Sequence, residues 1–175
     1  MPADELRRVF EIEVGEAANA TLERIRAQRV PATPRTILGD LRGDLTFVKP
    51  GLAVAAAQSK IGRNIFAYLF DWQSPNSALG ACHCIDLPFL FGNIDVWKAA
   101  PMLSGADWKE VGELSRLFRR ALAAFAEKGD PNGANLAEWP SYECRQAVMH
   151  FDRRISVGLD RLKLESGSSG RVGGS

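Results

Sequence analysis

The chain has 175 residues, of which 46% are hydrophobic and 25% are charged, so it can bury a core and is too apolar for a disordered chain. Lys and Arg total 22 against 21 Asp and Glu, and this balance predicts no attraction to nucleic acid or anionic lipid. No apolar run is long enough to cross a bilayer, and the charged first ten residues lack the apolar centre of a signal peptide. Three cysteines are too few for a disulfide framework, so the expected compartment is a reducing cytoplasm.

The first sixty residues are predicted to be mainly helical. Apolar residues recur at helical spacing over residues 4–29, with Gly15 as a dividing point, and two prolines are expected to end this stretch. Residues 40–62 are rich in alanine and predict further helix, with a break at Lys49-Pro50-Gly51.

Three short strands are predicted in the rest of the chain. Residues 64–70 form a β-branched and aromatic run that is typical of a buried strand. Residues 147–151 and 155–159 are spaced as the two strands of a hairpin, and residues 85–93 predict a short helical turn. Helices interleaved with a few strands indicate an α/β class.

The strongest periodic pattern lies over residues 107–128. Its apolar residues step by three or four and are Trp108, Val111, Leu114, Phe118, Leu122 and Phe125. Asp107 is the expected N-cap, Glu110 completes the spacing of a capping box, and Gly129 stands where a C′ glycine belongs. Three strands are few for so broad an apolar face, so we expect part of the face to be uncovered, as at the edge of a larger domain.

The chain has two histidines, and each has a plain structural interpretation. His83 follows a predicted strand and turn, where open α/β sheets bind ligands, and imidazole is a general base near neutral pH; by spacing alone, a surface role is the commoner one. His150 alternates with apolar neighbours, which predicts an outward-facing strand residue. Cys82, His83 and Cys84 are adjacent and have no second Cys/His pair, so they do not predict a zinc site.

Two ordered segments surround His83: Gly80-Ala81-Cys82-His83, and then Asp86-Leu87-Pro88-Phe89-Leu90-Phe91-Gly92. Together they resemble the catalytic-histidine segment of the type-B carboxylesterases, a family that includes bacterial para-nitrobenzyl-type esterases and the cholinesterases. Further motifs resemble the same family in the same order: Phe66 to Trp72, Phe125 to Asn132, Trp139 to Tyr142 and Met149 to Asp152. The resemblance covers roughly residues 40–160.

The resemblance implies an α/β-hydrolase fold, carboxylic ester substrates, a Ser–His–Glu/Asp triad, and neither a metal nor an organic cofactor. His83 falls on the family's general-base histidine, which takes the proton of the nucleophilic serine and returns it to the leaving alcohol. Asp86 stands where the family usually has glutamate. For Asp86 we expect a supporting role, such as a hydrogen bond to nearby backbone, and not the role of the triad acid.

The sequence departs from the family pattern at the other catalytic positions. No Gly-x-Ser-x-Gly elbow occurs in the 175 residues, and no glycine-rich oxyanion-hole loop or Glu-Gly triad-acid signature occurs either. A histidine without a nucleophile cannot form an acyl-enzyme, and without an acid its tautomer is not fixed. The chain alone is therefore expected to be catalytically silent.

Three hypotheses follow. In the first, residues 1–165 are the C-terminal part of a serine carboxylesterase and residues 166–175 form a disordered Gly/Ser-rich tail; the gene product is then split, truncated or partially predicted. In the second, the chain is a non-catalytic interaction module whose sheet edge pairs with a separate N-terminal esterase part. In the third, it is a cytosolic helical domain with an incidental histidine, which the ordered motifs disfavour.

Overall fold

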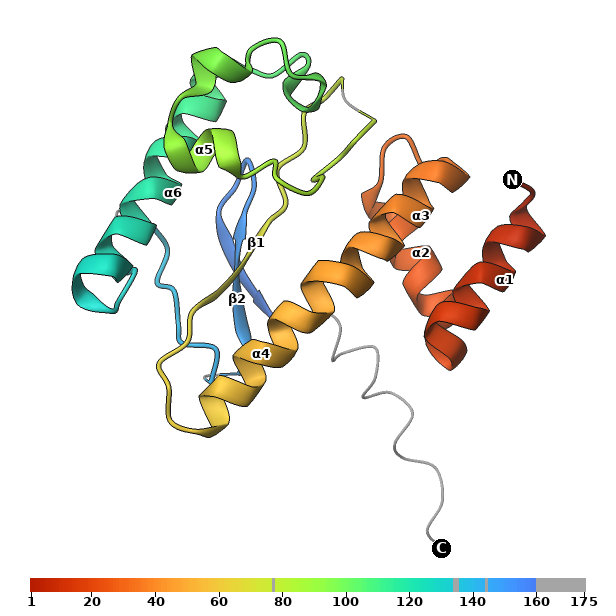
Figure 1. Ribbon diagram of the computed structural model, residues 1–175, viewed down its shortest axis with the longest axis horizontal. Coiled ribbons are helices and arrows are strands. Elements are labelled where there is room, and N and C mark those ends of the chain that lie inside the picture. Colours follow the sequence, from red (N-terminus) through yellow and green to blue (C-terminus); the bar gives the residue numbers. More distant parts are fainter. Residues whose placement is uncertain (77, 134–135, 144, 160–175) are drawn as a thin grey trace, which may run out of the picture. The chain divides into compact units, whose positions relative to one another are not determined.

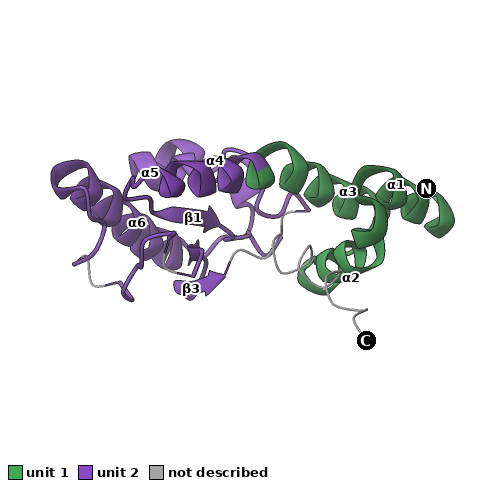
Figure 2. Cartoon of the chain, turned by 90° about the horizontal axis from the view of Figure 1, so that it is seen from below, with its two compact units in different colours: residues 1–49, 160–175 green, residues 50–159 purple. Residues whose placement is uncertain are grey.

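The computed structural model describes residues 1–76, 78–133, 136–143 and 145–159. These residues form two compact units, residues 1–49 and residues 50–159, drawn in green and purple in Figure 2. The predicted disordered tail, residues 166–175, lies outside the described residues. Within the described residues, no helix is both long enough and apolar enough to span a membrane.

The first unit is helical, as the periodicity predicts. Helix α1 (Ala3–Val14) and helix α2 (Ala18–Gln28) are separated by a 3-10 turn that begins at Gly15, where φ is +58°. Helix α3 (Pro34–Gly43) follows and begins with a capping box between Thr33 and Thr36. The core of this unit consists of Leu6, Phe10, Ala18, Leu22, Ile25, Ile37 and Leu41.

The predicted break at Lys49-Pro50-Gly51 is wrong. A π-helical turn spans Asp44–Val48, and helix α4 (Lys49–Lys60) continues from it without interruption. The backbone N–H of Lys49 donates to the carbonyl of Asp44, five residues back. Proline removes one N–H and crowds the preceding turn, and the i→i+5 turn directly before Pro50 is the usual form of such a local irregularity within a helix.

The second unit contains the predicted sheet (Figure 1). Its order is β1-β2-β3, with β1 (Ala67–Phe70), β2 (Ala147–Phe151) and β3 (Ser156–Leu159). Strands β1 and β2 are parallel, with Tyr68 opposite Met149, whereas β2 and β3 are antiparallel. The hairpin is therefore confirmed, and the strand predicted over 64–70 is present at 67–70, where only Ala67 is buried. All five residues of β2 are buried, as expected for a central strand.

Two helices pack against the sheet and form the main core with it. Helix α5 (Leu87–Phe91) packs against helix α6 (Trp108–Lys128), and both lie beside the sheet in Figure 1. Two 3-10 turns, Ile94–Trp97 and Pro101–Leu103, connect them. The Phe118 ring of α6 contacts strand residues Tyr68, Phe70 and Phe151 at centroid distances of 5.4, 5.2 and 4.8 Å.

The ends of α6 and the partial coverage of its apolar face agree with the sequence analysis. Asp107 accepts hydrogen bonds from the backbone N–H groups of Lys109 and Glu110, and Gly129 adopts the left-handed conformation at the other end. The apolar face is uncovered in part, as expected: its central residues are buried by the sheet and α5, and these are Val111, Leu114, Phe118 and Ala121. Only the terminal aromatic residues, Trp108 and Phe125, remain exposed, at 38% and 42%.

Candidate active-site loop

His83 lies in the loop between β1 and α5, and its side chain is exposed. The backbone N–H of Ile85 donates to the carbonyl of Cys82 at 3.1 Å, and the N–H of Leu87 donates to the carbonyl of Cys84 at 3.2 Å. His83 is therefore the second residue of a tight turn, and Cys84, the third, has a φ of +70°. These two consecutive turns present the imidazole at the protein surface.

The turn that carries His83 is anchored on the core at both ends. Cys82 packs against the main core cluster, and Ile85 is buried within it. Further along, Phe89 of α5 is fully buried, and its carbonyl accepts a hydrogen bond from Ser115 Oγ of α6 at 2.7 Å. An exposed side chain on a fixed backbone is the arrangement that a proton-transferring residue requires.

Asp86 occupies the N-cap position of α5 but makes no capping hydrogen bond with its side chain. Its carboxylate instead influences Tyr68 of β1. Burial raises the pKa of the Tyr68 hydroxyl, and the negative charge of Asp86 raises this pKa further. The charge of Asp86 thus acts on a residue of β1, while the supporting role of Asp86 in catalysis stays a prediction.

The two cysteines beside His83, Cys82 and Cys84, are partly buried and not in disulfides. Both lie at the corners of the two turns around His83, since Cys82 and Cys84 supply the carbonyls that close them. In the part of the chain that the structure describes, no three His, Cys, Asp or Glu side chains are grouped so that they could hold a metal ion.

His150 does not face outward as predicted. It is 5% exposed, and its Nδ1 is hydrogen-bonded to the carboxylate of Asp71. Because an ionised carboxylate only accepts, Nδ1 carries the proton of this pair. His150 Nε2 is buried without a hydrogen-bond partner among the described residues. The alternation rule fails here because β2 is central and has no solvent-facing side.

A group of polar contacts that the sequence did not indicate lies directly after β1, at Asp71 and Trp72. The backbone N–H groups of Asp71 and Trp72 both donate to the carbonyl of Phe151, at 2.9 and 3.1 Å. The indole Nε1 of Trp72 donates to Glu110 Oε1 at 2.6 Å. Glu110, predicted only as a capping residue, therefore bonds a side chain 38 residues away, and no local pattern reports such a pair.

Arg153, between β2 and β3, joins the same group. Its Nε lies 3.4 Å from Glu110 Oε1, and its Nη2 donates to the backbone carbonyl of Gln73 at 2.8 Å. Its guanidinium also lies 5.9 Å from the centre of the Trp72 ring. We call Trp72, Glu110 and Arg153 the strand-exit cluster.

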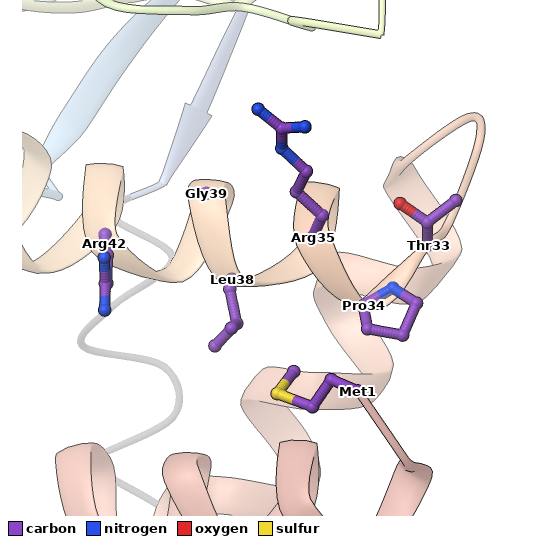
Figure 3. A pocket seen from close by; sticks show the side chains of 7 residues that line it. All are labelled: Met1, Thr33, Pro34, Arg35, Leu38, Gly39 and Arg42. Carbon is purple, nitrogen blue, oxygen red and sulfur yellow. The ribbon is translucent and has the colours of Figure 1, made fainter.

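A pocket in the first unit has a volume of about 490 Å³ (Figure 3). It lacks side chains that could act as a general base. Its lining consists of Met1, Thr33, Pro34, Arg35, Leu38, Gly39 and Arg42. Leu38 points toward Met1, whereas Arg35 points away from it. The lining has no imidazole or carboxylate, and its one hydroxyl, that of Thr33, takes part in capping α3.

Comparison with known proteins identifies the relatives of this chain. Residues 9–165 match the model of the carboxylesterase family. Phenmedipham hydrolase of Pseudarthrobacter oxydans is 38% identical over 112 residues, which are 63% of this chain and 22% of that protein. Para-nitrobenzyl esterase of Bacillus subtilis is 33% identical over 120 residues, which are 67% of this chain and 24% of that protein.

Solved structures agree with this result. A carboxylesterase of Geobacillus stearothermophilus superposes with a TM-score of 0.71 at 27% identity, and the match covers 96% of this chain and 35% of the esterase. The chain thus spans about a quarter of the length of these curated relatives and about a third of the solved structure. Its three-stranded sheet and helices are a fragment of the α/β-hydrolase fold, and the chain belongs to the carboxylesterase family.

Proposed function

We propose that this chain is the C-terminal part of a serine carboxylic-ester hydrolase and that His83 is its general base. The observation that carries the proposal is the exposed imidazole on a core-anchored turn after a parallel strand, in a chain of this family. We assign residues 1–165 to the hydrolase domain. Cys82 and Cys84, which are not in disulfides, are those of a protein kept in a reducing cytoplasm.

In the proposed reaction, the imidazole of His83 takes the proton of a serine hydroxyl as the serine oxygen bonds to the acyl carbon of the ester. The imidazolium then returns that proton to the alkoxide as the bond to the leaving alcohol breaks. Water, activated by the same imidazole, hydrolyses the acyl-enzyme and releases the carboxylic acid. These steps use no metal and no organic cofactor.

We expect the purified chain to be silent toward para-nitrophenyl acetate, because the serine elbow, the oxyanion loop and the triad acid are absent from its sequence. The measurement is release of para-nitrophenol by the chain and by its His83→Ala variant at equal concentration. Both rates are expected to equal the background rate. Turnover by the unsubstituted chain that disappears in the variant would show that the chain carries its own nucleophile.

A second function, as a non-catalytic interaction module, is favoured by the edge of β1. Among the described residues, β1 pairs only with β2. A parallel strand is normally covered on both sides, yet Tyr68 of β1 is 37% exposed and Leu69 and Phe70 are only partly buried. The opposite edge, β3, has the same length as β1 but carries Ser156 and Gly158, and a glycine weakens a strand.

For this second function we expect the chain to bind an N-terminal esterase part through the β1 edge. The test is co-purification of the tagged chain with the serine-containing part of a family member expressed as a separate polypeptide. Leu69→Pro takes a backbone N–H away from β1 and is expected to reduce the yield of the co-purified complex. Val157→Pro in β3 is the matched control, and equal losses of complex for both variants would contradict docking at β1.

A further inference from the structure

The strand-exit cluster includes Trp72, which lies in the chain between β1 and the loop that presents His83. Trp72 is fully buried, while the side chains of Glu110 and Arg153 are 30% and 48% exposed. An indole N–H has one donor and needs one acceptor when it is buried. Glu110 supplies a charged acceptor at 2.6 Å, which makes this a stronger bond than a neutral pair.

Trp72 transmits this restraint to the His83 loop by packing. Its ring lies 5.1 Å from the ring of Phe89 in an edge-on arrangement. Phe89 and Ile85 belong to the same core cluster as Trp72, and the N–H of Ile85 closes the turn that carries His83. A movement of the indole therefore displaces the buried anchors of that turn.

We propose that Glu110 is a positioning residue for His83, acting through the indole of Trp72 and the turn Cys82–Ile85. The inference rests on the proposed role of His83, since only a catalytic imidazole needs a fixed place. Glu110 sits in the first turn of α6, whose N-terminus Asp107 already caps, so its carboxylate is not needed for capping and is available to the strand exit.

The test uses the full purified chain, labelled with ¹⁵N and ¹³C. Amide hydrogen exchange is measured at Ile85 and Leu87, whose N–H groups close the two turns around His83. The imidazole signal of His83 is followed as well; with two histidines in the chain, His83→Ala and His150→Ala assign both signals. Glu110→Ala is expected to speed exchange at these two amides about tenfold more than at the amides of β2, and to shift or split the His83 signal.

Two further variants make the test specific. Glu110→Gln keeps a carbonyl acceptor for the indole and is expected to restore most of the protection. Trp72→Phe lacks the indole N–H and is expected to reproduce the effect of Glu110→Ala. If Glu110→Ala does not fold, Trp72→Phe provides the same test. Glu113→Ala removes an exposed carboxylate from the next turn of α6 and is expected to change neither signal.

Two results would overturn the proposal. One is unchanged exchange at Ile85 and Leu87 in folded Glu110→Ala; the other is equal acceleration in β2, which would make Glu110 a general stabilising residue. Both readouts report the position of His83 and not its chemistry. Failure of the positioning role is therefore distinguishable from failure of His83 as a base, which only turnover measures.

Discussion

In a chimera of para-nitrobenzyl esterase whose matching segment is replaced by this chain, His83→Ala is expected to lower kcat for para-nitrophenyl acetate by about 10⁴- to 10⁶-fold. The Bacillus subtilis enzyme is suitable because the aligned region covers 67% of this chain at 33% identity. Without the imidazole, the serine hydroxyl loses its proton acceptor and the alkoxide its proton donor, so both halves of the reaction slow. KM is expected to change little, because no substrate-binding group is removed.

Comparing the kcat values of two variants distinguishes the proposed general base, His83, from the proposed supporting residue, Asp86. Asp86→Asn leaves the imidazole in place and is expected to lower kcat by no more than about a hundredfold, the range typical of residues that orient a catalytic group. Circular dichroism and thermal melting of each variant establish that the fold is retained. A folded chimera that loses less than about tenfold with His83→Ala, or that is inactive with His83 intact, would contradict the proposed role.

The elements most accessible from sequence are those that local chemistry specifies. Helix α6 was predictable because its apolar residues repeat at helical spacing between an Asp N-cap and a C′ glycine, and these two caps form as expected. Strand β1 and the hairpin were predictable from their β-branched and aromatic residues and from their lengths. Each of these signals is complete within about twenty residues of chain.

Apart from the continuous helix at Lys49-Pro50-Gly51, the features that the sequence did not resolve depend on contacts that span the chain. The burial of His150 depends on its strand β2 being central, which requires the parallel partner β1 about eighty residues earlier. The hydrogen-bond partner of His150, Asp71, directly follows β1. The coverage of α6 depends on rings from β1 and β2 that meet Phe118. Glu110 has ideal spacing for a capping box, yet its carboxylate bonds Trp72. Local spacing cannot choose between two satisfied alternatives of this kind.

The candidate site divides in the same way. His83 became a candidate because ordered motifs surround it, although its spacing alone favoured a surface role. Its environment could not be predicted, because the turn conformation depends on Ile85 and Phe89 reaching a core built from α6 and β2. The residues that anchor the candidate loop are thus harder to find from sequence than His83, the candidate residue that the loop carries.

Gly158→Ala in β3 is expected to lower the free energy of unfolding by about 1–3 kcal/mol. A Cβ at this position would lie 2.7 Å from His150 Nε2 and 3.0 Å from its Cδ2. The ring has little room to move, because it is buried and its Nδ1 is bound to Asp71. Accommodating the methyl group therefore requires loss of a hydrogen bond to a charged group. Urea denaturation of the purified chain measures the change.

A matched glycine and a double-mutant cycle identify the cause. Gly112 lies within α6, and a Cβ there meets nothing within 4 Å, so Gly112→Ala is expected to stabilise the chain by about 0.5–1 kcal/mol. In the His150→Ala background the clash is gone, and Gly158→Ala is expected to cost less than about 0.5 kcal/mol, leaving a coupling energy of about 1–3 kcal/mol. An equal cost with and without the imidazole would mean that Gly158 is required by its backbone and not by His150.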